Sequence, residues 1–108
     1  MPFLGGRTMI YHIVMWNFKP EVEESKKPAI KADMAANLKG LVGQVPGLLT
    51  VEFVENTIPS STHEIALVTT LEKAEDIKVY ATHPAHVHVA DTYVRPYVCE
   101  RACLDCEI

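Results

Sequence analysis

The chain has 108 residues and a formal net charge of −4, with 48% apolar and 22% charged residues. These values are typical of one globular domain with a modest hydrophobic core. The acidic balance and the lack of a basic run argue against a nucleic-acid partner or an anionic membrane surface, and no segment approaches the roughly 20 consecutive apolar residues that span a bilayer.

The first eight residues, MPFLGGRT, contain a Gly5-Gly6 pair and no apolar stretch long enough for a signal peptide. We expect residues 1–8 to form a flexible leader and residues 9–108 to form the folded domain. With no export signal, the three cysteines are expected to be reduced thiols, which indicates a cytoplasmic location.

The stretch from Met9 to Phe18, MIYHIVMWNF, is rich in β-branched and aromatic residues and predicts a strand. Successive side chains of a strand point to opposite faces. One face carries Ile10, His12, Val14, Trp16 and Phe18, and the other carries Met9, Tyr11, Ile13 and Met15. Because both faces are apolar, we expect both to be covered.

A helix is predicted to begin near Ser25, to accommodate Pro28 in its first turn, and to stop at Pro46-Gly47. Apolar residues recur at helical spacing along this segment. They form one expected buried stripe of Ile30, Met34, Leu38, Leu41, Val42 and Val45.

The remaining segments alternate between strand and helix patterns. We expect a strand over 48–55 with Val51 and Phe53 on one side, a polar turn over 56–62, a strand over 64–71, a helix over 73–81, a helix from Pro84 to about 93 or 98, and a strand over 101–108 with Ala102, Leu104 and Cys106 on one face.

This order of elements predicts an α+β fold, a ferredoxin-like protomer with a four-stranded antiparallel sheet and helices on one face. Helices arranged in this way can cover only one face, yet the first strand is apolar on both. No spare segment is available for the second face, so we expect a second copy of the same sheet to cover it in a homodimer.

Three cysteines near the end of the chain, Cys99, Cys103 and Cys106, have the C-x3-C-x2-C spacing that holds an iron–sulfur cluster in radical S-adenosylmethionine enzymes. In a strand, Cys103 and Cys106 would point to opposite faces, where one metal could not easily reach both. Cysteine is also a common small buried hydrophobe. We therefore favour structural cysteines and predict no metal site.

The stretch YATHPAHVHVAD, residues 80–91, contains three histidines that helix geometry separates. His83 precedes a proline and is typical of a helix junction. His86 lies in line with an apolar and aromatic helix face, whereas His88 lies about 200° around the helix and should be exposed. One inward histidine near Tyr80 suits proton transfer, because histidine titrates near neutral pH and tyrosine can donate to a developing oxyanion.

Each remaining histidine has an ordinary structural interpretation. His12, alone on an apolar strand face, is typical of a hydrogen-bonded core group, and His63 in the polar turn is expected to be solvated. His86 could likewise only donate a hydrogen bond to backbone and tie its helix to the sheet.

Several segments together resemble the stress-responsive dimeric α/β-barrel family, Dabb. They are IYHIVMWNFKPEV, VPGLLTVEFVEN, IALVTTLE and YATHPAHVHVAD with the closing strand. The resemblance covers residues 9–108, and the H-P-x-H element followed by a valine is its most specific mark. It implies a ferredoxin-like protomer whose sheet packs on a second sheet to form a barrel dimer.

Plant members of this family that act as polyketide cyclases suggest roles for three residues. They close a ring by aldol condensation without a cofactor. By resemblance, the base is His86, the tyrosine that holds or polarises the substrate is Tyr80, and the nearby first-strand histidine is His12. A further histidine of those cyclases falls on Ile65 here, so this sequence departs from the full cyclase set.

We therefore expect an interior pocket for a small, largely apolar, oxygenated ligand. His12, Tyr80 and His86 should line it, with Val14, Trp16 and Phe53 in its walls and no cofactor. Such a pocket fits a cyclase or isomerase. A non-catalytic stress-associated dimer with a filled interior and a cofactor-independent monooxygenase on the same barrel remain alternatives.

Overall fold

A computed structural model describes residues 8–108. Residues 1–7, which make up most of the predicted leader, lie outside the described part of the chain. Thr8, the last residue assigned to that leader, donates a hydrogen bond from its hydroxyl to the carboxylate of Glu107. The next residue, Met9, exchanges backbone hydrogen bonds with Ile108, so this part of the predicted leader is tied to the end of the last strand.

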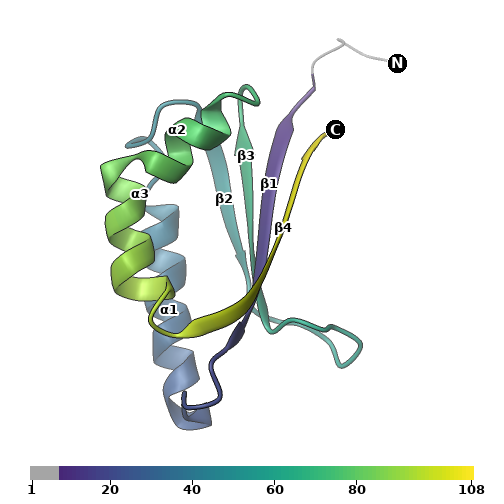
Figure 1. Cartoon of the computed structure of the whole chain (residues 1–108), viewed down its shortest axis with the longest axis vertical. Helices are drawn as coiled ribbons and strands as arrows, with labels where there is room; N and C mark the ends of the chain where they lie inside the picture. The colour runs from purple at the N-terminus through teal and green to yellow at the C-terminus, as the bar shows by residue number, and fades with distance from the viewer. Residues whose placement is uncertain (1–7) are drawn as a thin grey trace.

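The described residues form one antiparallel sheet with helices on one of its faces (Figure 1). The strand order is β2-β3-β1-β4, which with this element order confirms the predicted ferredoxin-like arrangement. The elements are β1 Ile10–Phe18, a short 3₁₀ turn Glu24–Lys26, α1 Lys27–Lys39, β2 Leu48–Val54, β3 Ile65–Leu71, α2 Asp76–Thr82, α3 Pro84–Val89, a π-helical turn Ala90–Val94, and β4 Val98–Glu107.

Strand β1 lies in the middle of the sheet, between β3 and β4, and its side chains alternate strictly in burial. The buried set faces the helices and comprises Ile10, His12, Val14, Trp16 and Phe18. The core that forms around this set also includes Met34, Leu38, Leu41, Val45, Leu48, Ile65, Leu67, Leu71, Tyr80, Val89 and Val94. The even-numbered face of β1 is therefore the floor of the core.

The opposite face of the sheet carries Tyr11, Ile13 and Met15 on β1, and the register places Leu104 of β4 beside Ile13. No helix of the described chain lies on this side (Figure 1). Leu104 is 57% exposed and lies next to these apolar side chains, so together they form one patch. The outer face is thus an apolar surface that the described chain leaves uncovered.

Helix α1 ends six residues earlier than the predicted end at Val45. Gly40 follows the helix, and Gly43 adopts a φ of 91°, a conformation that a right-handed helix cannot contain. Leu41 and Val45 still reach the core from the turns after the helix, but Val42 is 43% exposed. The predicted burial of Val42 was wrong because it assumed one unbroken helical period.

Strand β4 starts at Val98, three residues before the predicted start at 101. A shift in register against β1 falls between Met15 and Asn17, and Glu100 at this point has a φ of 55°. A bulge of this kind adds a residue to one strand and bends it. Pairing therefore continues from Cys103 past the bulge to Val98, opposite Phe18.

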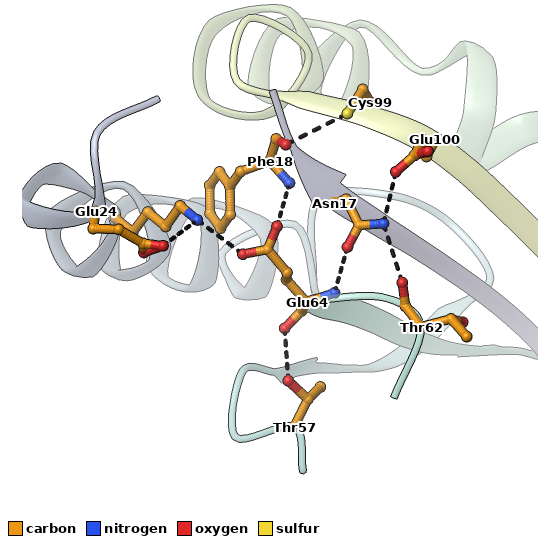
Figure 2. Close-up of polar contacts among 9 residues, drawn as sticks. Asn17, Phe18, Glu24, Thr57, Thr62, Glu64, Cys99 and Glu100 are labelled. Atoms are coloured by element: carbon orange, nitrogen blue, oxygen red, sulfur yellow. Dashed lines mark hydrogen bonds and ion pairs between the residues drawn. The ribbon is translucent and has the colours of Figure 1, made fainter. Parts of the chain in front are cut away.

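Near the C-terminal end of β1, the side chain of Asn17 links β1 to two other segments of the chain (Figure 2). Its amide nitrogen donates to the carbonyl of Thr62 and to the carboxylate of Glu100, and its amide oxygen accepts from the backbone N–H of Glu64. This side chain therefore fixes the start of β3 and the bulge of β4 against β1.

The carboxylate of Glu64 completes this cluster (Figure 2). It accepts from the backbone N–H of Phe18 at 3.0 Å and from the ammonium of Lys27 at 2.9 Å. Burial alone would raise the pKa of Glu64, but these hydrogen bonds and the charge of Lys27 lower it overall. We call Asn17, Glu64 and Lys27 the polar clamp.

Within residues 8–108, no helix is both long and apolar enough to cross a membrane.

Candidate functional site

A cavity of about 340 Å³ lies between the helices and the helix-facing side of the sheet. Its wall is mostly apolar. The lining residues are His12, Val14, Trp16, Leu38, Leu67, Tyr80, Ala81, His86, Ala90, Val94, Arg95, Val98, Cys99, Glu100 and Arg101. A cavity of this size and composition is typical of a site for a small organic ligand.

Tyr80, on α2, is 1% exposed, and its hydroxyl has no hydrogen-bond partner among the described residues. Buried hydroxyls are nearly always paired, so the unpaired hydroxyl of a residue that lines the cavity is a candidate hydrogen-bond donor to a bound molecule. Burial raises the pKa of Tyr80 to about 12. The phenol therefore stays protonated near neutral pH and can donate a hydrogen bond.

His86, on α3, lies against this tyrosine. The two ring centroids are 4.3 Å apart and the planes are tilted by 44°. Nδ1 of His86 lies 3.2 Å from the carbonyl oxygen of Ala81, and because a carbonyl only accepts, Nδ1 must carry the proton. In the neutral ring, Nε2 then holds the free electron pair.

The surroundings of His86 favour this neutral form. Burial lowers its pKa, and the positive charge of Arg95 and the nearby His12 lower it further, against the opposing Ala81 carbonyl and Asp91. A neutral imidazole at pH 7 is the form required of a general base.

His12 of β1 forms the third ring of the site. Its centroid is 6.0 Å from that of Tyr80, in an edge-to-face arrangement at 70°. Nδ1 of His12 contacts a carboxylate oxygen of Asp105, which lies opposite it on β4. This contact with β4 fixes the orientation of the His12 ring.

The structure brings most of the predicted site residues to one cavity. His12, Tyr80 and His86 line it, as do Val14 and Trp16. Phe53 does not: it lies on β2, the edge strand farthest from β4, and packs at the margin of the core. Its expected place in the pocket wall was wrong, because the sequence showed which side of β2 it faces but not how far β2 lies from α3.

The other histidines separate by structural role. His83 caps α3, because its Nδ1 accepts a hydrogen bond from the backbone N–H of Ala85, and His88 is exposed. His63 was expected to be solvated, but it is half-buried and its Nε2 lies 3.2 Å from the carbonyl of Glu100. The turn before β3 folds back on the β4 bulge, a long-range contact that local composition does not reveal.

The cysteines divide as the strand pattern predicted. Cys103 lies opposite Val14, on the helix-facing side, and Cys106 lies opposite Tyr11, on the outer side. All three cysteines are free thiols, and Cys103 is exposed. The C-x3-C-x2-C spacing therefore does not gather its sulfur atoms at one point.

Two features of the site were missed from sequence. Asp105 was not considered as a partner of His12, although the pairing of a strand that begins at Ile10 with one that ends at Glu107 could have suggested it. Arg95 and Arg101 add positive charge to the cavity wall. Arg101 lies next to the bulge, and nothing in the sequence signals the bulge.

A family model described as "Stress responsive A/B Barrel Domain" (Dabb) matches residues 10–108. The chain belongs to this family. No curated protein matches the sequence.

Solved structures resemble the chain over nearly its full length. One is a dimeric protein of unknown function with a ferredoxin-like fold from Bacteroides fragilis, which is 28% identical, has a TM-score of 0.83, and aligns over 93% of this chain and 96% of its own. This similarity confirms the ferredoxin-like fold of the chain.

Two named enzymes share the fold at lower identity. The hydroxynitrile lyase of Passiflora edulis is 16% identical with a TM-score of 0.67, and 93% of each chain is covered. A putative antibiotic biosynthesis monooxygenase of Nitrosomonas europaea is 13% identical with a TM-score of 0.65, covering 97% of this chain and 93% of its own. These likenesses show a common fold and nothing more.

Proposed function

We propose that this Dabb protein is a cofactor-independent enzyme that transfers a proton to and from a small carbonyl compound in the helix-side cavity. The observation that supports this most is the pairing of His86 and Tyr80 at 4.3 Å in one cavity, with a base on one side and an unpaired buried hydroxyl on the other. Cyclisation by aldol condensation and isomerisation through an enolate both begin with this proton transfer.

In the first step, Nε2 of His86 takes a proton from a carbon next to a carbonyl group. The electron pair of the C–H bond moves into the carbonyl, which becomes an enolate, and His86 becomes an imidazolium. Its proton is then returned to the product. A carbon between two carbonyls is the best match, because its acidity is closest to that of an imidazole near neutral pH.

Tyr80 donates a hydrogen bond to the enolate oxygen. Its pKa of about 12 means that it does not lose its own proton near neutral pH. A donor already held in a buried site needs no reorganisation as the negative charge develops, which is the origin of oxyanion stabilisation. His12, held by Asp105, orients the ligand from the sheet side.

The apolar wall supports a substrate with a hydrocarbon body. The apolar lining residues include Val14, Trp16, Leu38, Leu67 and Val94. Arg95 and Arg101 stand among the polar lining residues and suit an oxygen-rich end of the ligand. We infer a largely apolar ligand with two or more carbonyl oxygens.

The enzyme acts as a homodimer through the outer face of the sheet. The uncovered apolar surface around Ile13 and Leu104 supports this, and the similar protein of Bacteroides fragilis is described as dimeric. We expect a mass of about 24 kDa in solution, twice the 12.0 kDa of one chain, by light scattering. Ile13→Asp should give a monomer, since it places a charge in the centre of the interface. A wild-type protein that stays monomeric at micromolar concentration would contradict this assembly.

The proton transfer can be tested with a 2-alkyl β-keto ester that has one exchangeable carbon-bound proton. In D₂O, proton NMR follows the loss of that signal. The wild-type protein should accelerate the exchange above the buffer rate, and His86→Ala should reduce the protein-dependent rate by about 100-fold or more.

His88→Ala is the matched control, because His88 lies two residues away on the same helix but is exposed. It should exchange at the wild-type rate. Equal rates for His86→Ala and the wild type would refute the role of His86. Binding of the ester without accelerated exchange would support a non-catalytic pocket protein, and oxygen consumption with a quinol would support the monooxygenase alternative.

A further inference from the structure

A second cluster of reactive side chains lies at the β4 edge of the cavity. It contains His12, Cys103 and Asp105. Within residues 8–108, this is the group in which nitrogen, sulfur and carboxylate donor atoms gather within 4.8 Å of one another. The proton-transfer mechanism uses Asp105 only to orient His12 and does not use Cys103 at all.

The pairing of β1 with β4 builds this cluster. The register sets His12 opposite Asp105 and Val14 opposite Cys103. Cys103 and Asp105 are two residues apart on β4, so both side chains lie on the helix-facing side of the sheet, where His12 also lies. Side chains held on paired strands are positioned more rigidly than side chains on loops.

The distances within the cluster suit a tetrahedral cation. Sγ of Cys103 lies 3.7 Å from Nδ1 of His12 and 3.6 Å from Oδ1 of Asp105. Ligand atoms around a tetrahedral zinc are about 3.3–3.6 Å apart, given bond lengths of about 2.0–2.3 Å. The Nδ1 and Oδ1 atoms are in direct contact and would separate as the ion enters between them.

We propose that His12, Cys103 and Asp105 form a binding site for a zinc-class divalent cation, with one coordination position left open. A neutral imidazole, a thiolate and a carboxylate together balance the charge of such an ion. A thiolate and an imidazole favour zinc or cobalt over magnesium or calcium, which prefer oxygen ligands. Three protein ligands are typical of sites that keep a position for water or another ligand.

Access and the local charges decide how such an ion would enter. The side chain of Asp105 is 44% exposed and Cys103 is exposed, so the ion would reach these two residues directly from solvent. The side chain of His12 is only 10% exposed and would supply the buried ligand. Arg101 also lies near the sulfur and opposes binding. Burial and Asp105 raise the pKa of the Cys103 thiol, which makes it a proton-bearing group until a cation displaces the proton.

The test uses Co²⁺ alone, with tag-free, fully reduced protein and without any substrate. Cobalt bound through a thiolate gives a near-ultraviolet charge-transfer band, and a tetrahedral site gives strong visible bands. We expect about one equivalent per chain, and we expect Zn²⁺ to bleach the spectrum by displacement.

Cys103→Ser should abolish the charge-transfer band, and Asp105→Asn should weaken Zn²⁺ binding by about tenfold or more in calorimetric titration. Cys106→Ser is the matched control, because Cys106 lies on the same strand but on the opposite face, and it should bind like the wild type. Circular dichroism checks that each variant is folded.

Two results would overturn the proposal: the absence of a thiolate–cobalt band in the wild type, or a band that survives Cys103→Ser. The proposal does not rest on the proposed proton transfer. The metal titration is done without substrate, so it can give a negative result while the exchange assay is positive. It can equally give a positive result while the exchange assay is negative.

Discussion

The polar clamp is half-buried and its polar atoms are paired, whereas the cavity is lined by a residue whose buried hydroxyl is not. At Asn17 and Glu64, each side-chain oxygen and nitrogen has a partner within the chain. In the cavity, the hydroxyl of Tyr80 is buried and has none among the described residues. A satisfied cluster stabilises the fold, whereas an unsatisfied buried group costs free energy unless a ligand pairs with it. The contrast separates a region that serves folding from the region that we propose to bind a ligand.

Of the three tests of this contrast, substitution of Tyr80 by Phe should show the largest effect on function. The rate of proton exchange should fall by about 10–100-fold, because the enolate loses its hydrogen-bond donor. The free energy of unfolding should stay the same or rise by up to about 1 kcal/mol, because a buried unpaired hydroxyl is removed. NMR exchange and thermal unfolding measure the two. A clear loss of stability would mean that the hydroxyl is paired within the protein and that the contrast is false.

Substitution of Asn17 by Ala should have the reverse outcome. Three hydrogen bonds are lost, and we expect the free energy of unfolding to fall by about 2 kcal/mol. The exchange rate per folded molecule should fall less than in Tyr80→Phe, since Asn17 does not line the cavity and reaches it only through Glu100. Glu55→Ala, at an exposed position after β2, is the control and should change stability by less than about 0.5 kcal/mol. A large loss of activity in folded Asn17→Ala protein would show that the polar clamp also supports the cavity, and it would contradict the separation of the two regions.

The pH dependence should be the smallest effect of the three. Burial lowers the pKa of His86 below its usual 6.5, so the base is neutral at pH 7 and is lost only as the pH falls below 6.5 through the lower folded value. The unfolded chain binds more protons over this window, so stability also decreases as the pH falls through it. An NMR titration of the His86 ring checks the shift. A pKa above 6.5 would remove the argument for a neutral base.

The sequence predicts β1 well because a run of β-branched and aromatic residues is typical of a strand, and strand geometry then divides its side chains between two faces. The identity of β4 was also predicted, but its start was not. The bulge at Glu100 depends on pairing with β1 and on the side chain of Asn17, 83 residues earlier in the chain. Interactions of this range have no local signature.

For the candidate site, helix geometry separated His86 from His88, but the pairing of Tyr80 with His86 came from the family resemblance, because a break at His83 lies between their two helices. The contact between His12 and Asp105 was missed because it requires the register of two strands at opposite ends of the sequence. Phe53 was misplaced for a related reason: the face of a strand can be predicted from alternation, but its position in the sheet order cannot.

The alternation of β1 has an evolutionary consequence. His12, Val14 and Trp16 line the cavity, while Tyr11, Ile13 and Met15 form the outer face, so point substitutions can change either surface without touching the other. The shape of the cavity and self-association can therefore change independently within one strand of nine residues. An insertion or deletion of one residue would exchange the two surfaces at once. Lineages of this protein should accumulate substitutions freely along β1 and retain its length.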